Sequence, residues 1–333
     1  MKEADPAFVA ALERAGILAP GESAAIESLP GGVSSDIVLV RHGGRRVCVK
    51  RALAKLKVAA EWRAPVERNH AEAEWLRVVA EILPGAVPQL LAEDRAAGLF
   101  AMEYLAPASH PVWKDQLRDG LIDPAFAAEV GRRVARIHAA TARREDIARR
   151  FANDHIFYPI RLEAYLVASA EKHADVRGAL AGLVETTRAT KLALVHGDVS
   201  PKNILAPPEG PMFLDAECAV YGDPAFDLAF CLNHLLLKCL WRPNWRSRYL
   251  ACFTALSDAY VGGVTWEPRA EMEARAAALL PGLFLARVDG KSPVEYLTDE
   301  VAREHVRRAA KRMLARAPAR LAEIAKNWSR ELA

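Results

Sequence analysis

Short apolar runs of the length of β-strands recur through much of the first hundred residues. Four stretches show this pattern: residues 37–40, 46–50, 89–92 and 99–102. The turn at residues 42–45, His-Gly-Gly-Arg, is typical of a hairpin between the first two of them. Residues 66–80 instead carry apolar positions at helical spacing, and residues 6–15 predict a short helix ahead of the strands. The front of the chain is therefore expected to be strand-rich with one prominent helix.

Beyond about residue 107 the spacing of the apolar positions becomes helical. Six stretches show it: residues 124–142, 159–173, 224–238, 246–261, 268–280 and 298–327. Two short strand patterns, at 192–196 and 212–214, flank a loop. A strand-rich front joined to a helical back predicts an α+β chain in two lobes, with residues 1–105 as the smaller lobe and 106–333 as the larger.

The overall composition is that of a globular protein. The chain has 333 residues, of which 52% are hydrophobic and 26% charged, so it has ample material for a core and is not mostly disordered. It carries 45 Lys and Arg against 42 Asp and Glu, a net charge of +3. An excess this small does not indicate a nucleic-acid partner, and we expect none.

Neither export nor membrane insertion is indicated by the sequence. Residues 1–10 lack the basic segment and apolar run of a signal peptide. The most apolar stretch, residues 228–240, is too short to span a bilayer and contains Asn233, His234 and Lys238. The five cysteines form no CxxC pair and have mostly apolar neighbours, which is typical of reduced thiols rather than a zinc site. We therefore expect a cytoplasmic protein with no membrane partner.

The candidate chemistry lies between the two late strand patterns. His196, Asp198 and Asn203 stand at the spacing H-x-D-x-x-x-x-N, and Asp215 follows twelve residues later behind an apolar pair. Phosphoryl transfer needs these parts: a carboxylate that orients the attacking hydroxyl, and an amide oxygen and a second carboxylate that hold Mg²⁺. Asp198 is the candidate catalytic residue, and Asn203 and Asp215 are the candidate Mg²⁺ ligands. His196 is expected to hold the loop by hydrogen bonds.

The first lobe contains candidates for binding the phosphates of a nucleotide. Gly31 and Gly32 allow the backbone to approach phosphates, and the hydroxyls of Ser34 and Ser35 can donate hydrogen bonds. Lys50 ends the second strand pattern, at the position where a strand lysine contacts phosphates. We expect these five residues to bind ATP.

Two further predictions complete the nucleotide site. Glu72 and Glu74 both lie on the predicted helix, and Glu72 is the preferred ion-pair partner of Lys50 because it shares a helix face with Trp75. The strand at 99–102 runs into a connection between the lobes, where backbone groups of Glu103 and Leu105 are expected to pair with adenine.

The chain resembles the aminoglycoside phosphotransferase and choline kinase-like family over roughly residues 25–240. Three motifs carry the resemblance: His196-Gly197-Asp198 to Asn203, Asp215-x-Glu217, and residues 222–229, Gly-Asp-Pro-Ala-Phe-Asp-Leu-Ala. The family implies a two-lobed protein-kinase-like fold, with a small β-rich N-lobe and a larger helical C-lobe, and dependence on ATP and Mg²⁺. Within it, the 5-methylthioribose kinases look most similar around residues 49–73 and 215–227. Asn203 departs from their expected serine, and this chain is shorter.

The resemblance also implies residue roles. Asp198 would be the catalytic base, and Asn203 and Asp215 would bind Mg²⁺. Glu217 would reach a second metal ion or form a salt bridge, and both alternatives stay open. Asp227 would bond the backbone of the catalytic loop, while Asp223, placed before a helical pattern, is expected to cap that helix.

The expected acceptor is the hydroxyl of a small molecule. Only seven residues separate Asp215 from Asp223, too few for the peptide-binding activation loop of a protein kinase. A sugar such as methylthioribose, an amino alcohol and an aminoglycoside all remain open. A cationic acceptor would need acidic or aromatic residues of the large lobe, for which the candidates are Asp154, Glu163, Glu217, Trp241, Trp245 and Trp266. The alternative function is a catalytically silent kinase-fold scaffold. The sequence does not indicate an oligomeric state.

Overall fold

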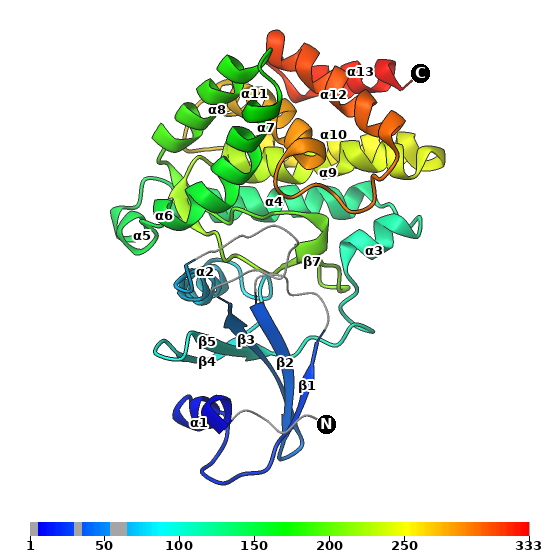
Figure 1. The fold of residues 1–333 in the computed structure, drawn as a ribbon. Coiled ribbons are helices and arrows are strands. Elements are labelled where there is room, and N and C mark those ends of the chain that lie inside the picture. The colour runs from blue at the N-terminus through cyan, green and yellow to red at the C-terminus, as the bar shows by residue number, and fades with distance from the viewer. Residues whose placement is uncertain (1–5, 30–34, 54–64, 333) are drawn as a thin grey trace.

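A computed structural model of the chain describes residues 6–29, 35–53 and 65–332. It has two lobes, a β-sheet with two helices and a larger body of helices, and the connection between them follows the sheet's β5 strand (Figure 1). The α+β, two-lobed architecture expected from the sequence is confirmed.

The small lobe is a five-stranded antiparallel sheet. Its strands follow the order β1 (Ala25–Ser28), β2 (Ser35–His42), β3 (Arg45–Ala52), β5 (Leu99–Glu103), β4 (Leu90–Asp94). The four strands expected from the sequence are present, and β1 is an addition. Alternate residues of β3 face opposite sides of the sheet. Val47 and Val49 pack with helix α1 (Pro6–Arg14), whereas Cys48 packs with helix α2 (Arg68–Ile82). Lys50 therefore faces α2 as well.

The large lobe is built from helices, and its bounds are α3 (Trp113–Arg118), α4 (Pro124–Thr141), α5 (Glu145–Arg150), α6 (Asp154–Phe157), a π-helix (Tyr158–Val167), α7 (Ala168–Lys172), α8 (Arg177–Ala189), α9 (Ala225–Trp241), α10 (Arg246–Gly262), α11 (Arg269–Asp289), α12 (Glu300–Ala315) and α13 (Leu321–Glu331). Two short 3₁₀ turns lie at Pro201–Asn203 and Pro243–Trp245. Every residue of α9 from Ala225 to Cys239 is buried, so this helix is the centre of the lobe.

Four short strands carry the loops that face the small lobe. β6 (Ala193–Val195) pairs with β9 (Val220–Gly222), and β7 (Ile204–Leu205) pairs with β8 (Met212–Phe213). The loop after β6 and the loop after β8 are thereby brought together, although they are separated in the chain. Figure 1 shows this region beneath α4 and above α2.

Three helical expectations need correction in detail. The stretch 298–327 is two helices, because Pro318 interrupts it between α12 and α13. α11 continues nine residues beyond 280 and includes Pro281, although proline removes a helical hydrogen bond. The stretch 159–173 begins as a π-helix, which sequence periodicity does not distinguish from an α-helix.

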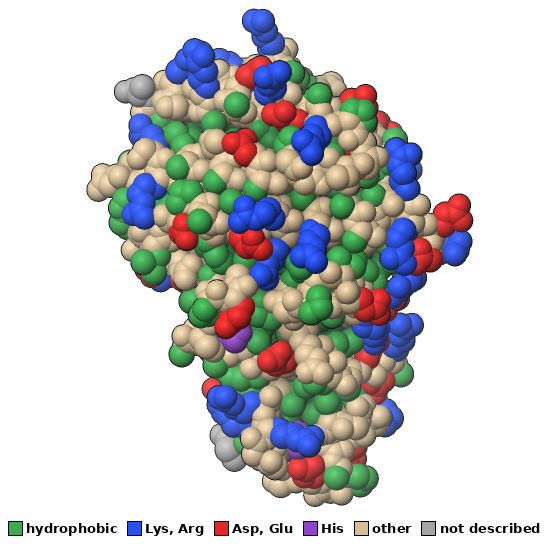
Figure 2. Space-filling model, turned by 180° about the vertical axis from the view of Figure 1, so that it is seen from behind, with side chains coloured by type: hydrophobic (Ala, Val, Ile, Leu, Met, Phe, Trp, Pro, Cys, Tyr) green, Lys and Arg blue, Asp and Glu red, His purple; other side chains and the backbone are tan. Residues whose placement is uncertain are grey.

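The surface and the cysteines add little to the functional question. In the described ranges no helix is both long and apolar enough to cross a bilayer. On the face seen in Figure 2, basic and acidic side chains are interspersed. All five cysteines are free and buried, and burial raises the pKa of Cys252 to about 12.

Candidate active site

The loop that follows β6 is held by a carboxylate from the start of α9. Asp227 accepts hydrogen bonds from the backbone N–H groups of His196, at 2.7 Å, and Gly197, at 2.8 Å. Four residues earlier in the chain, Asp223 accepts a hydrogen bond from the N–H of Ala225, the first residue of α9, at 3.0 Å. The two expectations for these carboxylates, a bond to the loop backbone and a helix cap, are confirmed. The loop geometry is thus fixed by buried helix α9.

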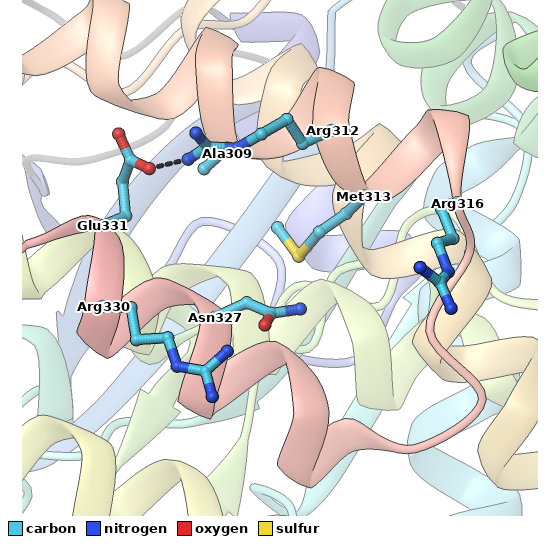
Figure 3. Close-up of a pocket in the computed structure, with 7 residues that line it drawn as sticks. All are labelled: Ala309, Arg312, Met313, Arg316, Asn327, Arg330 and Glu331. Atoms are coloured by element: carbon cyan, nitrogen blue, oxygen red, sulfur yellow. Dashed lines mark ion pairs between the residues drawn. The ribbon is translucent and has the colours of Figure 1, made fainter.

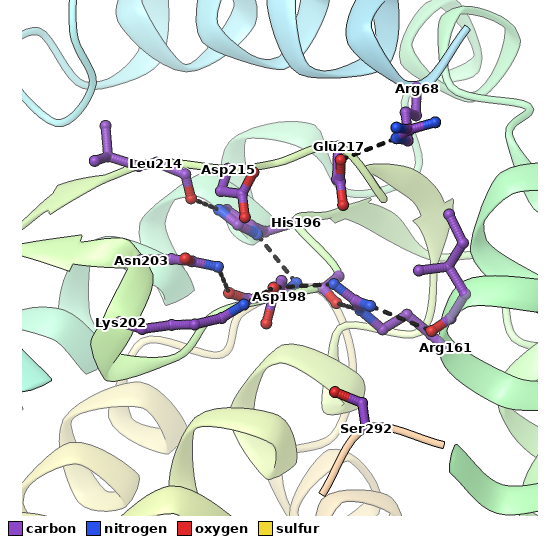
Figure 4. A network of polar contacts seen from close by, with 12 residues as sticks. Arg68, Arg161, His196, Asp198, Lys202, Asn203, Leu214, Asp215, Glu217 and Ser292 are labelled. Atoms are coloured by element: carbon purple, nitrogen blue, oxygen red, sulfur yellow. Dashed lines mark hydrogen bonds and ion pairs between the residues drawn. The ribbon is translucent and has the colours of Figure 1, made fainter. Parts of the chain in front are cut away.

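His196 locks the loop internally. Its Nδ1 accepts from the N–H of Asp198 and its Nε2 donates to the carbonyl of Leu214, each at 3.1 Å (Figure 4). Burial lowers its pKa, so the imidazole is neutral, as these two bonds require. Its ring meets Trp75 of α2 edge-on at 4.7 Å. The expected hydrogen-bonding role is confirmed, and the histidine also links the loop to the small lobe's helix.

Gly197 occupies a backbone conformation that glycine favours. Its φ is +80°, and a Cβ atom at this position would lie 2.8 Å from the carbonyl oxygen of Cys218. A side chain would therefore push the loop away from the segment that follows Asp215. The glycine allows these two segments to pack closely.

Asp198 lies between two basic side chains. Its Oδ2 is 3.0 Å from Nη2 of Arg161 and 3.2 Å from Nζ of Lys202, and the side chain is 5% exposed. Burial by itself would raise the pKa of this carboxyl, but Lys202 and Arg161 outweigh it, so the pKa lies below its usual value. Asp198 is therefore ionised at neutral pH.

Neither basic partner was predicted from the sequence. Lys202 lies within the motif itself, four residues after Asp198. Arg161 comes from the π-helix and also donates to the carbonyl of Gly197. Its signal in the sequence is a lone charge in the run Ile160-Arg161-Leu162, and π-helices are frequent at functional sites.

Asn203 and Asp215 are brought together by backbone bonding between their loops. The N–H of Leu214 donates to the carbonyl of Asn203 at 2.9 Å. The Nδ2 of Asn203 donates to the carbonyl of Asp198 at 3.1 Å, which presents its Oδ1 as the remaining acceptor. Asp215 has φ +67°, a left-handed conformation that is uncommon for residues other than glycine and often marks functional sites. An amide oxygen and a carboxylate are hard oxygen donors, which fit Mg²⁺.

Lys50 contacts acidic groups of both lobes. Its Nζ lies 2.6 Å from Oε2 of Glu72 and is also paired with Oδ1 of Asp215. Burial opposes its charge, but Asp215 and Glu72 outweigh burial, so the pKa of Lys50 is raised and it stays charged. Glu74 instead pairs with Arg77 and Arg150. The choice of Glu72 over Glu74 as the partner of Lys50 is confirmed.

Glu217 forms a buried salt bridge. Its Oε2 is 3.1 Å from Nε of Arg68, the first residue of α2, and Arg68 also donates to the carbonyls of Leu53 and Pro65. Figure 4 shows this pair beside Asp215. Of the two alternatives for Glu217, the salt bridge is present, and contact with a second metal ion stays a prediction. Arg68 itself was not predicted as part of the site.

The remaining nucleotide-site predictions concern the turn before β2 and the connection between the lobes. Gly31, Gly32 and Ser34 lie outside the described residues. Ser35 is buried at the start of β2, and its Oγ has no hydrogen-bond partner within the described part of the chain. The N–H of Glu103 is engaged with the carbonyl of Gln89 at 2.8 Å, so this group is not available to adenine, and the pairing of adenine with Glu103 and Leu105 stays a prediction.

Comparison with known proteins gives the class of protein that this fold and site define. Residues 25–258 match the phosphotransferase enzyme family, and the chain belongs to that family. Methylthioribose kinase of Erwinia tasmaniensis is 28% identical over 224 residues, which are 59% of this chain and 55% of that protein. The chain therefore matches about half the length of this relative. The family resemblance expected from the motifs is confirmed.

Two solved structures share the fold. The complex of amicoumacin kinase hAmiN with AMP-PNP and Ca²⁺ has a TM-score of 0.55 at 14% identity, covering 95% of each chain. Spectinomycin phosphotransferase APH(9)-Ia, solved with ADP and spectinomycin, has a TM-score of 0.54 at 11% identity, covering 99% of each chain. At such low identity the likeness concerns the two-lobed fold alone.

Proposed function

We propose that the protein is an ATP- and Mg²⁺-dependent phosphotransferase that moves the γ-phosphoryl group to a hydroxyl of a small molecule. One observation carries the proposal: Lys50, Asp215, Asn203 and Asp198 converge at the junction of the lobes, held by buried hydrogen bonds and ion pairs. These are the parts that phosphoryl transfer requires, and this chemistry depends mainly on positioning and charge neutralisation.

Asp198 orients the acceptor in this mechanism. Its carboxylate accepts a hydrogen bond from the acceptor hydroxyl, whose oxygen forms a bond to the γ-phosphorus while the bond to the oxygen of the departing ADP breaks. The hydroxyl proton passes to Asp198. Because the pKa of Asp198 is lowered by Lys202 and Arg161 against the effect of burial, the carboxylate is a weak base. Proton transfer is then late, as suits a loose phosphoryl transition state.

Lys50 and the hinge hold the nucleotide. Lys50, positioned by Glu72, contacts the phosphates, and the carbonyl of Glu103 and N–H of Leu105 pair with the adenine edge. Ser35, with Gly31, Gly32 and Ser34, contributes to phosphate binding. Asn203 and Asp215 would hold Mg²⁺, which would supply charge neutralisation at the phosphates of the nucleotide. Glu217 acts through its salt bridge with Arg68, which fixes the segment after Asp215 against α2.

The acceptor is a small hydroxylated compound, of which a sugar has support from the relatives named methylthioribose kinase. The acidic residues that an amino alcohol or aminoglycoside would use are engaged elsewhere. Asp154 pairs with Lys191, Glu163 pairs with Lys291, and Glu217 pairs with Arg68. These pairings give a cationic acceptor no free carboxylate among the three.

The test is an assay of ADP release from Mg-ATP against a panel of sugars, amino alcohols and aminoglycosides. Asp198→Asn is the control because it keeps the size of the side chain. Acceptor-dependent release that disappears in Asp198→Asn and on removal of Mg²⁺ supports the proposal. Binding of Mg-ATP, measured by calorimetry, without release from any acceptor would support the scaffold alternative, and absence of nucleotide binding would refute both.

A further inference from the structure

A second group of buried basic side chains lies in the large lobe, beyond Asp198. Lys238 and His234 are one turn apart on α9, and Arg287 belongs to α11. Their exposed fractions are 1%, 6% and 7%. We call Lys238, His234 and Arg287 the basic cluster. None of the three belongs to the phosphoryl-transfer machinery described above.

Ring contacts connect the basic cluster to the catalytic carboxylate. The guanidinium of Arg161, which pairs with Asp198, lies 5.8 Å from the centre of the Tyr165 ring, and Arg287 lies 5.6 Å from the same ring. Arg161 also lies 5.7 Å from the ring of Phe230, which is 5.7 Å from that of His234. Arg161, the partner of Asp198, and the basic cluster therefore contact the same two rings, those of Tyr165 and Phe230.

Among the described residues, no nitrogen atom of the basic cluster has a hydrogen bond or ion pair to a carboxylate, and Glu295 acts on Lys238 and Arg287 only at longer range. Nε2 of His234 and Nε of Arg287 are buried without a hydrogen bond among the residues described. The acceptors of Arg287 Nη1 are Tyr165 Oη and the carbonyl and Oγ of Ser292, all uncharged. Lys238 Nζ lies 4.9 Å from the ring of Trp241 and 4.8 Å from that of Tyr296, and no ion pair of Lys238 occurs in the described ranges.

The other basic side chains buried at the site show how unusual this is. Lys50 pairs with Glu72, Arg68 with Glu217 and Arg161 with Asp198. A buried charge without a counter-charge is costly, and it persists in proteins where something else is gained. Burial lowers the pKa of His234, and Arg287, Lys238 and Lys202 lower it further, so His234 is neutral and can offer only a hydrogen bond, while the positive charge lies on its neighbours.

Lys114 extends the basic lining but is already neutralised. It lies 6.0 Å from the ring of Tyr296 and pairs with Glu295, whose side chain is 66% exposed. This pair is at the solvent edge, whereas Lys238 and Arg287 are inside. The unpartnered positive charge is thus internal, where an oxyanion gains most from it.

Resting on the proposed phosphotransferase function, we propose that the acceptor carries an oxyanion, a carboxylate or a phosphate monoester, which binds Lys238, Arg287 and His234 while its hydroxyl meets Asp198. Arginine and lysine are the groups that recognise such oxyanions, and the aromatic rings of Trp241 and Tyr296 exclude water around them. A neutral sugar would leave the cluster uncompensated, and a cationic acceptor would be repelled by it.

A basic pocket elsewhere in the large lobe serves as a control. It has a volume of about 390 Å³ and lies between α12 and α13, lined by Arg312, Arg316 and Arg330 (Figure 3). Arg312 pairs with Glu331 and is 60% exposed on its side chain. Neither of the two basic partners of Asp198, Arg161 and Lys202, lines this pocket. Substituting Arg316 removes a positive charge of the lobe without touching the basic cluster.

The experiment measures anion binding by the full chain with Mg-AMP-PNP, using thermal shift and calorimetry. The probes are inorganic phosphate, ribose 5-phosphate and D-glycerate, with ribose and glycerol as neutral counterparts. We expect the wild type and Arg316→Met to bind at least one anionic probe. Lys238→Met should weaken that binding about 10- to 100-fold, and Lys238→Arg should retain most of it. Preference for ribose 5-phosphate over D-glycerate identifies a phosphate site, and the reverse a carboxylate site.

The inference is overturned if no anionic probe binds, if Lys238→Met binds as the wild type does, or if Arg316→Met alone abolishes binding. In the ADP-release assay, Lys238→Met should raise KM for the anionic acceptor about tenfold or more while kcat stays within about threefold. Equal turnover of a neutral or cationic acceptor by wild type and Lys238→Met would keep the phosphotransferase function and refute the oxyanion. Absence of Mg-ATP binding would refute both.

Discussion

Lys50 and Lys238 are both buried lysines, 3% and 1% exposed, yet their surroundings are opposite. Lys50 has two carboxylates, Glu72 and Asp215, and its pKa is raised against the effect of burial. Lys238 has two aromatic rings and, within the described ranges, no paired carboxylate, and burial together with the charge of Lys114 lowers its pKa to about 7. On the proposed nucleotide side, carboxylates of the protein balance the charge of Lys50. On the proposed acceptor side, an anion from the acceptor would balance the charge of Lys238.

The difference separates two kinds of buried charge. At Lys50 the protein supplies the counter-charges, and these fix the relative positions of β3, α2 and the loop of Asp215. At Lys238 the structure tolerates an uncompensated group within its most buried helix. Removal of the two lysines should therefore have opposite consequences for stability, and the following predictions test this contrast, beginning with the catalytic carboxylate that lies between the two sides.

Asp198→Asn should have the largest effect. Because the amide cannot accept the hydroxyl proton, we expect kcat to fall roughly 10³-fold. The Kd for Mg-ATP should stay within about threefold, since Lys50 and Asp215 are untouched. Steady-state kinetics and calorimetry on the same preparation measure the two quantities. A variant that retains near wild-type turnover would show that Asp198 is not the catalytic residue.

Lys50→Met should damage both nucleotide binding and stability. It leaves Glu72 and Asp215 facing each other in a buried site without their cation, and breaking a buried pair in this way costs about 3–5 kcal/mol. We expect Tm to fall by roughly 5–10 °C and the KM for ATP to rise at least about tenfold. Lys311→Met, which removes a surface partner of Asp175, is the matched control and should change neither quantity appreciably. An unchanged Tm in Lys50→Met would show that the pairing of Lys50 with Glu72 and Asp215 does not stabilise the fold.

Lys238→Met should stabilise the protein in the absence of ligand. The folded pKa is about 7 against an ordinary 10.5, so between these pH values the unfolded chain binds more protons. The wild type therefore gains stability as pH rises through this window, and the variant does not. The charged and titratable groups that act on Lys238 are Lys114, Glu295, Asp115 and Cys231.

The measurement is Tm of both proteins between pH 6 and pH 9. We expect the variant to be more stable at pH 6 by a few degrees, with the gap closing as pH rises. A gap that stays constant with pH would mean that Lys238 does not titrate in this range. A variant less stable than wild type at pH 6 would mean that Lys238 is a stabilising cation, as Lys50 is.

Lys202→Met should have the smallest effect, a shift of the pH profile. Lys202 and Arg161 together outweigh burial in lowering the pKa of Asp198. Without Lys202 that pKa rises, so the acidic limb of kcat/KM should move to higher pH. The profile above neutral pH should be unchanged. An acidic limb at the wild-type position would show that another group controls it.

Local pattern was sufficient for much of the fold and for the pairing of Lys50 with Glu72. An apolar run ending in Lys50 predicted a strand lysine, and helical spacing at residues 66–80 selected Glu72 as its partner, because a helix face is readable from one sequence. The motif around Asp198 and the Asp215 segment were also evident, because a short chain segment holds most of their parts. Arg68 and Arg161 were missed, since each meets its carboxylate from a segment far away in the chain.

The sequence by itself determined the two-lobed α+β architecture, the family, and the identity of the carboxylates and the lysine expected to handle ATP. It showed His234 and Lys238 only as polar interruptions of an apolar stretch, which argued against a membrane span. Tertiary structure alone decided that these two residues lie inside the lobe with Arg287, about fifty residues further on, and that none of the three pairs directly with a carboxylate in the part of the chain that the structure describes. The physical reason is that periodicity reports which face of an element is buried, whereas the electrostatic balance of a site depends on which distant elements pack together.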